Sequence, residues 1–234
     1  MTAAAALADQ LLESIRAALE PHGLFLRGTV NLEEGETAPA LGGGKPAASV
    51  VLIGNIGGSL WEPFTRWRQC EPERGGADPL DDWSKRVILP VAEAAGATAY
   101  FPSDPPWQPF QQWAMRAEGL RASPLGILIH PRYGLWHGYR GALGFDRAMP
   151  ALGGVAGGHA CDSCDEKPCL RACPADALVS GTFDVGRCRT YLGHETGTGG
   201  CLAEGCRSRD ACPVGRDYRY SAKQLRFHMA ALRL

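Results

Sequence analysis

Eight of the nine cysteines of this chain lie in its C-terminal third, between Cys161 and Cys212. The N-terminus has no basic segment followed by an apolar run, so we expect no secretory signal and a cytoplasmic protein. Cysteines in that compartment are kept reduced and rarely form disulfides. Eight clustered thiols therefore indicate metal binding, and eight is the number of thiolates that two four-iron clusters require.

The first four of these cysteines follow the pattern Cys-x2-Cys-x4-Cys-x3-Cys-Pro: Cys161, Cys164, Cys169 and Cys173. This pattern is close to the run with which bacterial two-cluster ferredoxins hold [4Fe–4S] clusters, where three cysteines bind one cluster and the fourth reaches the other. A second quartet also ends in a Cys-Pro pair: Cys188, Cys201, Cys206 and Cys212. The sequence therefore predicts a ferredoxin-like module with two [4Fe–4S] clusters.

The same crossing rule predicts which cysteines share a cluster. One cluster is expected on Cys161, Cys164, Cys169 and Cys212, and the other on Cys173, Cys188, Cys201 and Cys206. The x4 gap stands where x2 is usual, and the second quartet has long, irregular gaps, so the split between the clusters stays open. The alternative is a pair of structural zinc sites with four cysteines each, although zinc motifs do not usually show a crossed pair of Cys-Pro ends.

Composition and charge limit the remaining possibilities. The 234 residues carry a formal net charge of −1, and 45% of them are hydrophobic, which is enough for one or two packed domains. The balanced charge gives no electrostatic footprint for nucleic acid, and no apolar stretch is long enough to span a membrane. The isolated Cys70 is expected to be a buried or half-buried small apolar residue.

Apolar periodicity and turn residues divide the first 150 residues into alternating helices and strands. Helices are expected over residues 7–19, 59–68, 79–95 and 111–117. Strands are expected over residues 24–30, 49–53 and 98–101, and a pair of strands over 126–130 and 135–145. This alternation predicts a layered domain of helices on a sheet over residues 1–150. A glycine-rich linker and a cluster domain over residues 156–234 are expected to follow.

The segment from Cys161 to Phe227 resembles the cluster domain of epoxyqueuosine reductases and related corrinoid reductases. The features that carry the resemblance are Cys173-Pro174, the Cys-Arg-Thr-Tyr-Leu run that begins at Cys188, and Cys212-Pro213. The resemblance implies a ferredoxin-like domain with two [4Fe–4S] clusters that works together with a corrinoid.

A motif that begins at Gly126, Gly-Ile-Leu-Ile-His-Pro-Arg-Tyr-Gly-Leu-Trp, is followed by Tyr139-Arg140-Gly141. It is very similar to a segment of MMACHC-type cobalamin-processing proteins. This resemblance implies that most of residues 5–147 adopt that family's fold, a nitroreductase-like α/β sandwich, so that the whole chain is α+β. It also implies a cobalamin-binding segment with five residues: His130, Arg132, Tyr133, Trp136 and Arg140.

Together the two resemblances imply an oxidoreductase that binds cobalamin or another corrinoid. It would reduce the cobalt or remove its upper ligand with electrons from the clusters, and an upstream electron donor would be a partner. Two alternatives stay open: a plain two-cluster electron carrier, and a reductase whose corrinoid attacks an organic substrate. The second alternative needs a proton donor, for which Tyr133, Tyr139 and His137 are candidates. The nitroreductase relationship raises the question of a flavin, but no residue argues for one.

Overall fold

The computed structural model describes residues 3–154, 158–179 and 182–232. These residues form two compact units. The sheet unit comprises Met1–Gly119 and Gly138–Gly154, and the cysteine unit comprises Leu120–His137 and Val155–Leu234. The boundary predicted at residue 156 lies outside the described residues. The chain also passes from one unit to the other after Gly119 and after His137, so each unit is assembled from two separate stretches of sequence.

The sheet unit is built on a four-stranded sheet with the order β1-β2-β6-β3. The strands are β1 (Phe25–Asn31), β2 (Ser49–Ile56), β3 (Thr98–Tyr100) and β6 (His137–Phe145). β1 runs antiparallel to β2 with Val30 opposite Val50, and β3 runs antiparallel to β6 with Ala99 opposite Leu143. β6, the last of these four strands in sequence, therefore lies inside the sheet, between β2 and β3.

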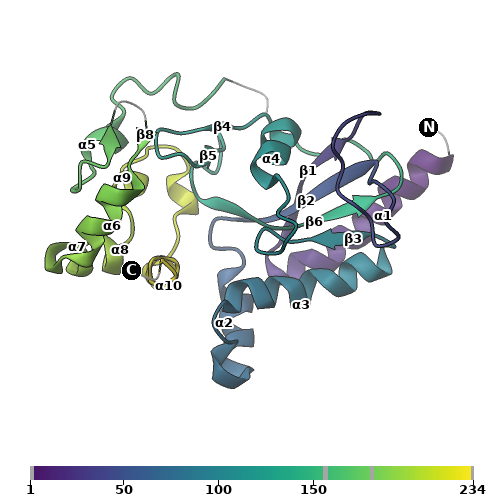
Figure 1. Cartoon of the computed structure of the whole chain (residues 1–234), viewed down its shortest axis with the longest axis horizontal. Helices are drawn as coiled ribbons and strands as arrows, with labels where there is room; N and C mark the ends of the chain where they lie inside the picture. The colour runs from purple at the N-terminus through teal and green to yellow at the C-terminus, as the bar shows by residue number, and fades with distance from the viewer. Residues whose placement is uncertain (1–2, 155–157, 180–181, 233–234) are drawn as a thin grey trace. The chain divides into compact units, whose positions relative to one another are not determined.

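Helices cover both faces of this sheet (Figure 1). They are α1 (Ala3–Leu19), α2 (Trp61–Cys70), α3 (Pro79–Ala94) and α4 (Phe110–Glu118), with short 3-10 turns η1 (Glu20–His22) and η2 (Pro72–Arg74). A Cβ atom on Gly28 of β1 would lie 2.7 Å from Ala117 of α4, and one on Gly141 of β6 would lie 2.8 Å from Ile88 of α3. The glycines therefore let α4 and α3 approach the sheet closely.

The core of the sheet unit forms around β2, whose residues Val50 to Ile53 are fully buried. A strand that is apolar on both faces is typical of a sheet covered on both sides. Trp83 of α3 and Phe64 of α2 are also fully or almost fully buried, and their rings meet edge to face at 5.8 Å. The amphipathic helices thus complete a core that the strand begins.

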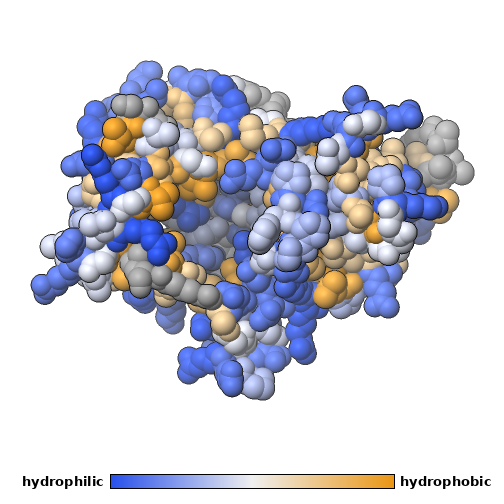
Figure 2. Space-filling view, viewed as in Figure 1, coloured by the Kyte–Doolittle hydropathy of each residue, from blue (hydrophilic) through white to orange (hydrophobic). Residues whose placement is uncertain are grey.

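The cysteine unit consists of short elements joined by turns. Its strands pair two by two: β4 (Arg121–Ala122) with β5 (Leu128–Ile129), and β7 (Leu178–Val179) with β8 (Thr182–Phe183). Its helices are α5 (Pro168–Arg171), α6 (Val185–Gly193), α7 (Glu195–Gly199), α8 (Cys201–Glu204), α9 (Arg207–Asp210), η3 (Arg216–Tyr218) and α10 (Ala222–Ala230). Asp184 caps α6 through Arg187 N–H, and Ser221 caps α10 through Gln224 N–H. Figure 2 shows hydrophobic and hydrophilic side chains mixed over the surface of this unit, on the left of the view.

The mixed α+β character predicted from the sequence is confirmed, but one strand pairing is wrong. The strands expected over 126–130 and 135–145 do not pair with each other, since β5 pairs with β4 and β6 joins β2 and β3. The reason is a tight turn between them, in which the backbone of His130 bonds to that of Gly134 and leaves both strands to other partners. None of the helices among the described residues combines the length and the apolar character needed to cross a bilayer.

Candidate functional site

The first set of cysteines, group I, comprises Cys161, Cys164, Cys169 and Cys212, none of which forms a disulfide. Burial, together with neighbouring thiols, raises the pKa of Cys161 to about 11. The neighbouring thiols are those of Cys212, Cys169 and Cys164. Cys212 is far from the other three in sequence, and the fold brings its thiol near theirs. Group I therefore contains the four cysteines that the crossing rule predicts to share a cluster.

The second set, group II, comprises Cys173, Cys188, Cys201 and Cys206. All four line one small cavity, together with side chains from β8, α6, α9 and α10. Burial raises the pKa of Cys188, and the thiols of the other three members add to this rise. The eight cysteines thus form two sets of four, one around each of two places in the cysteine unit. That they bind iron remains a prediction.

Backbone N–H groups point at sulfur atoms in group II. Ala177 N–H donates to Cys173 Sγ at 3.4 Å. Burial raises the pKa of Cys206, and backbone N–H groups of Ser208 and Arg209 oppose that rise. Hydrogen bonds of this kind stabilise thiolate sulfur and tune iron–sulfur clusters. The surroundings of the sulfur atoms therefore suit metal-bound thiolates.

A closed single-ion centre brings its ligands close together. Across the residues that the structure describes, no three His, Cys, Asp or Glu side chains gather closely enough to hold one metal ion. Around a tetrahedral zinc the sulfur atoms lie about 2.3 Å from the metal, and so about 4 Å from one another. In a four-iron cluster each cysteine binds a different iron atom, and the sulfurs stand farther apart. Iron in the two groups stays a prediction, with zinc as its alternative.

Residues 130–136, the HPRYGLW segment, form a tight turn in the cysteine unit. His130 N–H donates to the Gly134 carbonyl oxygen at 2.9 Å, and Gly134 N–H donates to the His130 carbonyl oxygen at 2.8 Å. Nδ1 of His130 accepts the N–H groups of Arg132 and Tyr133 at 3.0 and 3.2 Å. In the neutral imidazole the proton therefore sits on Nε2. His130, which is 8% exposed, holds the turn that displays Arg132 and Tyr133.

Tyr218 of η3 completes an aromatic group that the sequence analysis did not include. The ring of His130 stacks on Tyr133 with centroids 4.1 Å apart, and Tyr133 meets Tyr218 edge-on at 4.9 Å. Nε of Arg132 donates to the Tyr218 hydroxyl at 2.8 Å. Arg132 is exposed, and both tyrosines are half-buried. One guanidinium and two phenol rings are thus presented together, which suits a ligand with anionic or amide groups beside a flat surface.

Trp136 is part of the packing of the cysteine unit, because only 1% of it is exposed. The guanidinium of Arg209 lies 4.3 Å from the centroid of the Trp136 ring and 4.7 Å from that of Tyr220. Nη2 of Arg209 also donates to the Leu135 carbonyl oxygen at 2.6 Å. A cation that contacts both rings fixes this end of the HPRYGLW segment. In this arrangement Trp136 supports the turn that carries Arg132.

Arg140 lies in β6 of the sheet unit, whereas the other four predicted pocket residues lie in the cysteine unit. Nη1 of Arg140 lies 3.7 Å from Oδ1 of Asp81, and its Nε donates to the carbonyl oxygen of Tyr139 at 2.9 Å. The structure therefore groups His130, Arg132 and Tyr133 with one another. It places Arg140 in a different set of contacts.

Tyr139 points into a buried ionic network of the sheet unit. Its hydroxyl donates to Oε2 of Glu118 at 2.8 Å, and Glu118 accepts two N–H groups of Arg27 at 2.9 and 3.0 Å. The side chains of Arg27 and Glu118 are 2% and 3% exposed. Burial, with the Glu118 carboxylate beside it, raises the pKa of Tyr139 well above its usual value. The Tyr139 hydroxyl is thus bound to the Glu118 carboxylate, and the choice among Tyr133, Tyr139 and His137 stays open.

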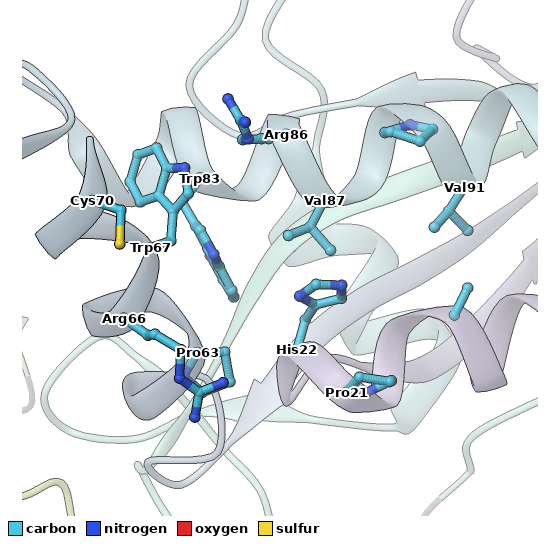
Figure 3. A pocket seen from close by; sticks show the side chains of 12 residues that line it. Pro21, His22, Pro63, Arg66, Trp67, Cys70, Trp83, Arg86, Val87 and Val91 are labelled. Atoms are coloured by element: carbon cyan, nitrogen blue, oxygen red, sulfur yellow. The ribbon is translucent and has the colours of Figure 1, made fainter. Parts of the chain in front are cut away.

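A cavity of about 650 Å³ opens in the sheet unit between the end of α1, α2 and α3 (Figure 3). Its walls include the rings of Trp67, Trp83 and His22. Arg66 and Arg86 also line it, and each is paired with a carboxylate, at 2.7 and 3.5 Å. A mostly apolar lining of this volume is typical of small-molecule sites. None of the five residues predicted to bind cobalamin belongs to the described lining of this cavity.

Cys70 lies at the edge of the same cavity and is exposed. The expectation that Cys70 is buried or half-buried is therefore wrong. Cys70 is the last residue of α2, where the helix ends away from the buried Phe64, so its side chain receives little cover from the core.

The chain has no match among family models and none among curated protein sequences. A solved structure with a similar fold is that of the C. elegans B12-trafficking protein CblC, a human MMACHC homologue. The likeness covers 94% of this chain and 92% of that chain, with a TM-score of 0.53 and 13% sequence identity. At this identity the likeness shows the fold alone. It confirms the expected MMACHC-type fold, while the two clusters stay a prediction.

Proposed function

We propose that the chain is an iron–sulfur protein that binds a corrinoid of the cobalamin type and reduces its cobalt or removes its upper ligand. One observation carries the proposal: eight cysteines form two groups of four in the unit that also holds the HPRYGLW segment. The fold supports it, because the structurally similar CblC protein is a B12-trafficking protein.

Groups I and II would each hold one [4Fe–4S] cluster. When bound, such clusters supply single electrons at potentials as low as about −700 mV. The chain contributes burial and N–H groups at the sulfur atoms, such as the one that Ala177 donates to Cys173. Both features set the potential at which a cluster gives up its electron. The chemistry at cobalt belongs to the corrinoid, and the chain supplies the pocket.

Arg132, Tyr133 and Tyr218 are the side chains that we assign to corrinoid binding. Corrinoids carry amide side chains, and cobalamin adds a phosphate. The guanidinium of Arg132 can donate charge-assisted hydrogen bonds to such oxygen atoms, and the Tyr218 hydroxyl at 2.8 Å fixes its direction. The two phenol rings offer flat apolar surface beside it. His130 holds the turn in place through its Nδ1.

Titration of the anaerobically reconstituted protein with hydroxocobalamin tests this function. We expect a saturable shift of the corrinoid visible spectrum. Arg132→Gln should weaken binding about tenfold, which corresponds to one lost charge-assisted hydrogen bond. Arg121→Gln is the matched control, because Arg121 is an exposed arginine of the same stretch, with 57% of its side chain accessible and Asp162 as its partner. The control should bind within about twofold of the unchanged protein.

The outcomes separate the candidate functions. If Arg132→Gln weakens the shift and Arg121→Gln does not, the result supports corrinoid binding at the HPRYGLW segment. No shift at saturating protein, with cluster spectra present, leaves a plain two-cluster electron carrier. A shift that neither variant changes places the corrinoid elsewhere in the chain and removes the assignment of Arg132.

A further inference from the structure

The HPRYGLW segment lies directly against the chain that follows the Cys212-Pro213 pair. Gly134 and Gly215 have φ angles of +59° and +72°. A Cβ atom on Gly134 would lie 2.1 Å from the carbonyl oxygen of Val214, and one on Gly215 would lie 2.3 Å from that of Tyr133. Only glycine permits so close an approach with such angles. The two stretches of backbone are therefore in contact immediately beyond a group I cysteine.

Apolar side chains on both sides of the segment extend this contact. Ile129 and Leu135, each 3% exposed, form one buried cluster with Cys212. Ala160, Cys161 and Val214 pack against the same cluster. Two of the four group I cysteines thus share a core with the flanks of the HPRYGLW segment. Within the described residues, no cysteine of group II belongs to that core.

Group II has different surroundings. Its cavity is lined by Phe183 of β8, by Tyr191 and Leu192 of α6, and by Met229 of α10. Of the described lining residues, none comes from the stretch Leu120–His137. The two groups therefore differ in their neighbours: group I contacts the HPRYGLW segment, and group II is enclosed by the C-terminal helices.

We infer that group I is the metal group that delivers electrons to a ligand held at the HPRYGLW segment. Group II is then the outer group, which receives electrons from the donor. This inference rests on the function proposed above. In each one-electron step a low-potential donor loses one electron and the cobalt of the bound corrinoid gains it. An upper ligand, where one is present, leaves with the electron pair of its bond to cobalt. Because electron transfer slows steeply with distance, the group in contact with the segment is the one placed to deliver the electron.

Two matched variants test the assignment, Cys212→Ser in group I and Cys201→Ser in group II. Both cysteines are 7% exposed, so the two replacements disturb similarly buried positions. Each reconstituted variant should lose about half of the iron and keep the other cluster. After reduction with dithionite, the remaining cluster is observed by electron paramagnetic resonance before and after addition of cob(II)alamin, a paramagnetic corrinoid. Broadening depends on the distance between the two spins and requires no turnover. Loss of the cluster signal by electron transfer to the cobalt also requires proximity and counts as the same result.

We expect cob(II)alamin to broaden the signal of Cys201→Ser, which retains group I, and to leave that of Cys212→Ser nearly unchanged. Equal broadening in both variants, or broadening only in Cys212→Ser, overturns the inference while corrinoid binding stands. Failure of the unchanged protein to bind cobalamin in the titration above overturns the proposed function, and this inference with it. The two failures are therefore distinguishable.

A second pair of variants covers the case in which a serine variant does not assemble. Leu135→Ala removes cover from group I, and Leu192→Ala removes it from group II, with the two leucines 3% and 1% exposed. In the fully loaded protein, Leu135→Ala should change one of two cluster signals, and only this one should broaden with cob(II)alamin. Leu192→Ala should change the other signal. If Leu135→Ala alters the signal that cob(II)alamin does not broaden, the inference is wrong.

Discussion

Arg209 links three parts of the cysteine unit. Its backbone N–H points at the thiol of Cys206 in group II, and its carbonyl oxygen accepts the N–H of Cys212 in group I at 3.3 Å. Its guanidinium lies against the rings of both Trp136 and Tyr220. One residue of α9 therefore connects both cysteine groups to the HPRYGLW segment. The planar shape of the guanidinium, and not its charge alone, lets it contact both rings.

Replacement of this cation tests its role. Arg209→Lys should lower the free energy of unfolding by about 1–2 kcal/mol, because a lysine ammonium cannot stack on both rings and also reach the Leu135 carbonyl oxygen. Urea unfolding in the absence of oxygen measures the change. Arg207→Lys is the control, since Arg207 lies on the same helix with 55% of its side chain exposed, and its effect should stay within about 0.5 kcal/mol. Equal losses in the two variants would contradict the stacking role.

Much of the residue-scale account was visible in the sequence, but not all of it. The crossing rule gave the same two sets of four cysteines that lie near one another in the structure, while their role as cluster ligands stays a prediction. Tyr218 could not be predicted, since its approach to Arg132 depends on the contact between Gly134 and Gly215, two loop glycines distant in sequence. The packing of Trp136 likewise involves Arg209 and Tyr220, which are distant from it in sequence.

At the scale of elements, the ion pair between Arg27 and Glu118 fastens β1 to α4. Tyr139 adds β6 to the network through its hydroxyl, and Arg27 Nη1 donates to the carbonyl oxygen of Asn55 in β2 at 3.1 Å. Three strands and one helix thus meet at a charged pair that water barely reaches. Removal of one partner leaves the other charge buried without compensation.

Glu118→Gln should therefore lower the free energy of unfolding by about 3–5 kcal/mol. The matched replacement Glu62→Gln breaks an exposed pair, in which the side chains of Arg66 and Glu62 are 70% and 83% accessible, and should cost at most about 0.5 kcal/mol. Thermal or urea unfolding compares the two. A loss below about 1 kcal/mol for Glu118→Gln would show that the network does not hold these elements together.

Periodicity predicted most elements of the sheet unit within a few residues, because apolar faces specify helices and strands locally. The expected pairing of 126–130 with 135–145 failed for a non-local reason. The turn at Gly134 folds onto the chain after Cys212, and β6 takes its partners from strands that lie much earlier in sequence. Adjacent strands usually pair, and here a contact within the cysteine unit replaces that pairing.

At the scale of the whole molecule, the cysteine unit is assembled from two stretches that the sequence separates. Residues 120–137 leave the sheet unit, pack against the chain around Cys212, and return as β6. The MMACHC-like motif is thereby divided, with Arg132 in the cysteine unit and Arg140 in the sheet. This arrangement places the HPRYGLW segment and the cysteines in one structural unit, which is the basis of the proposed coupling between corrinoid and clusters.

The most direct test of the central claim is the metal and sulfide content of protein purified without oxygen. Two [4Fe–4S] clusters predict about eight iron and about eight acid-labile sulfide per chain. About two zinc per chain without sulfide, which is the content of two four-cysteine zinc sites, would contradict the account.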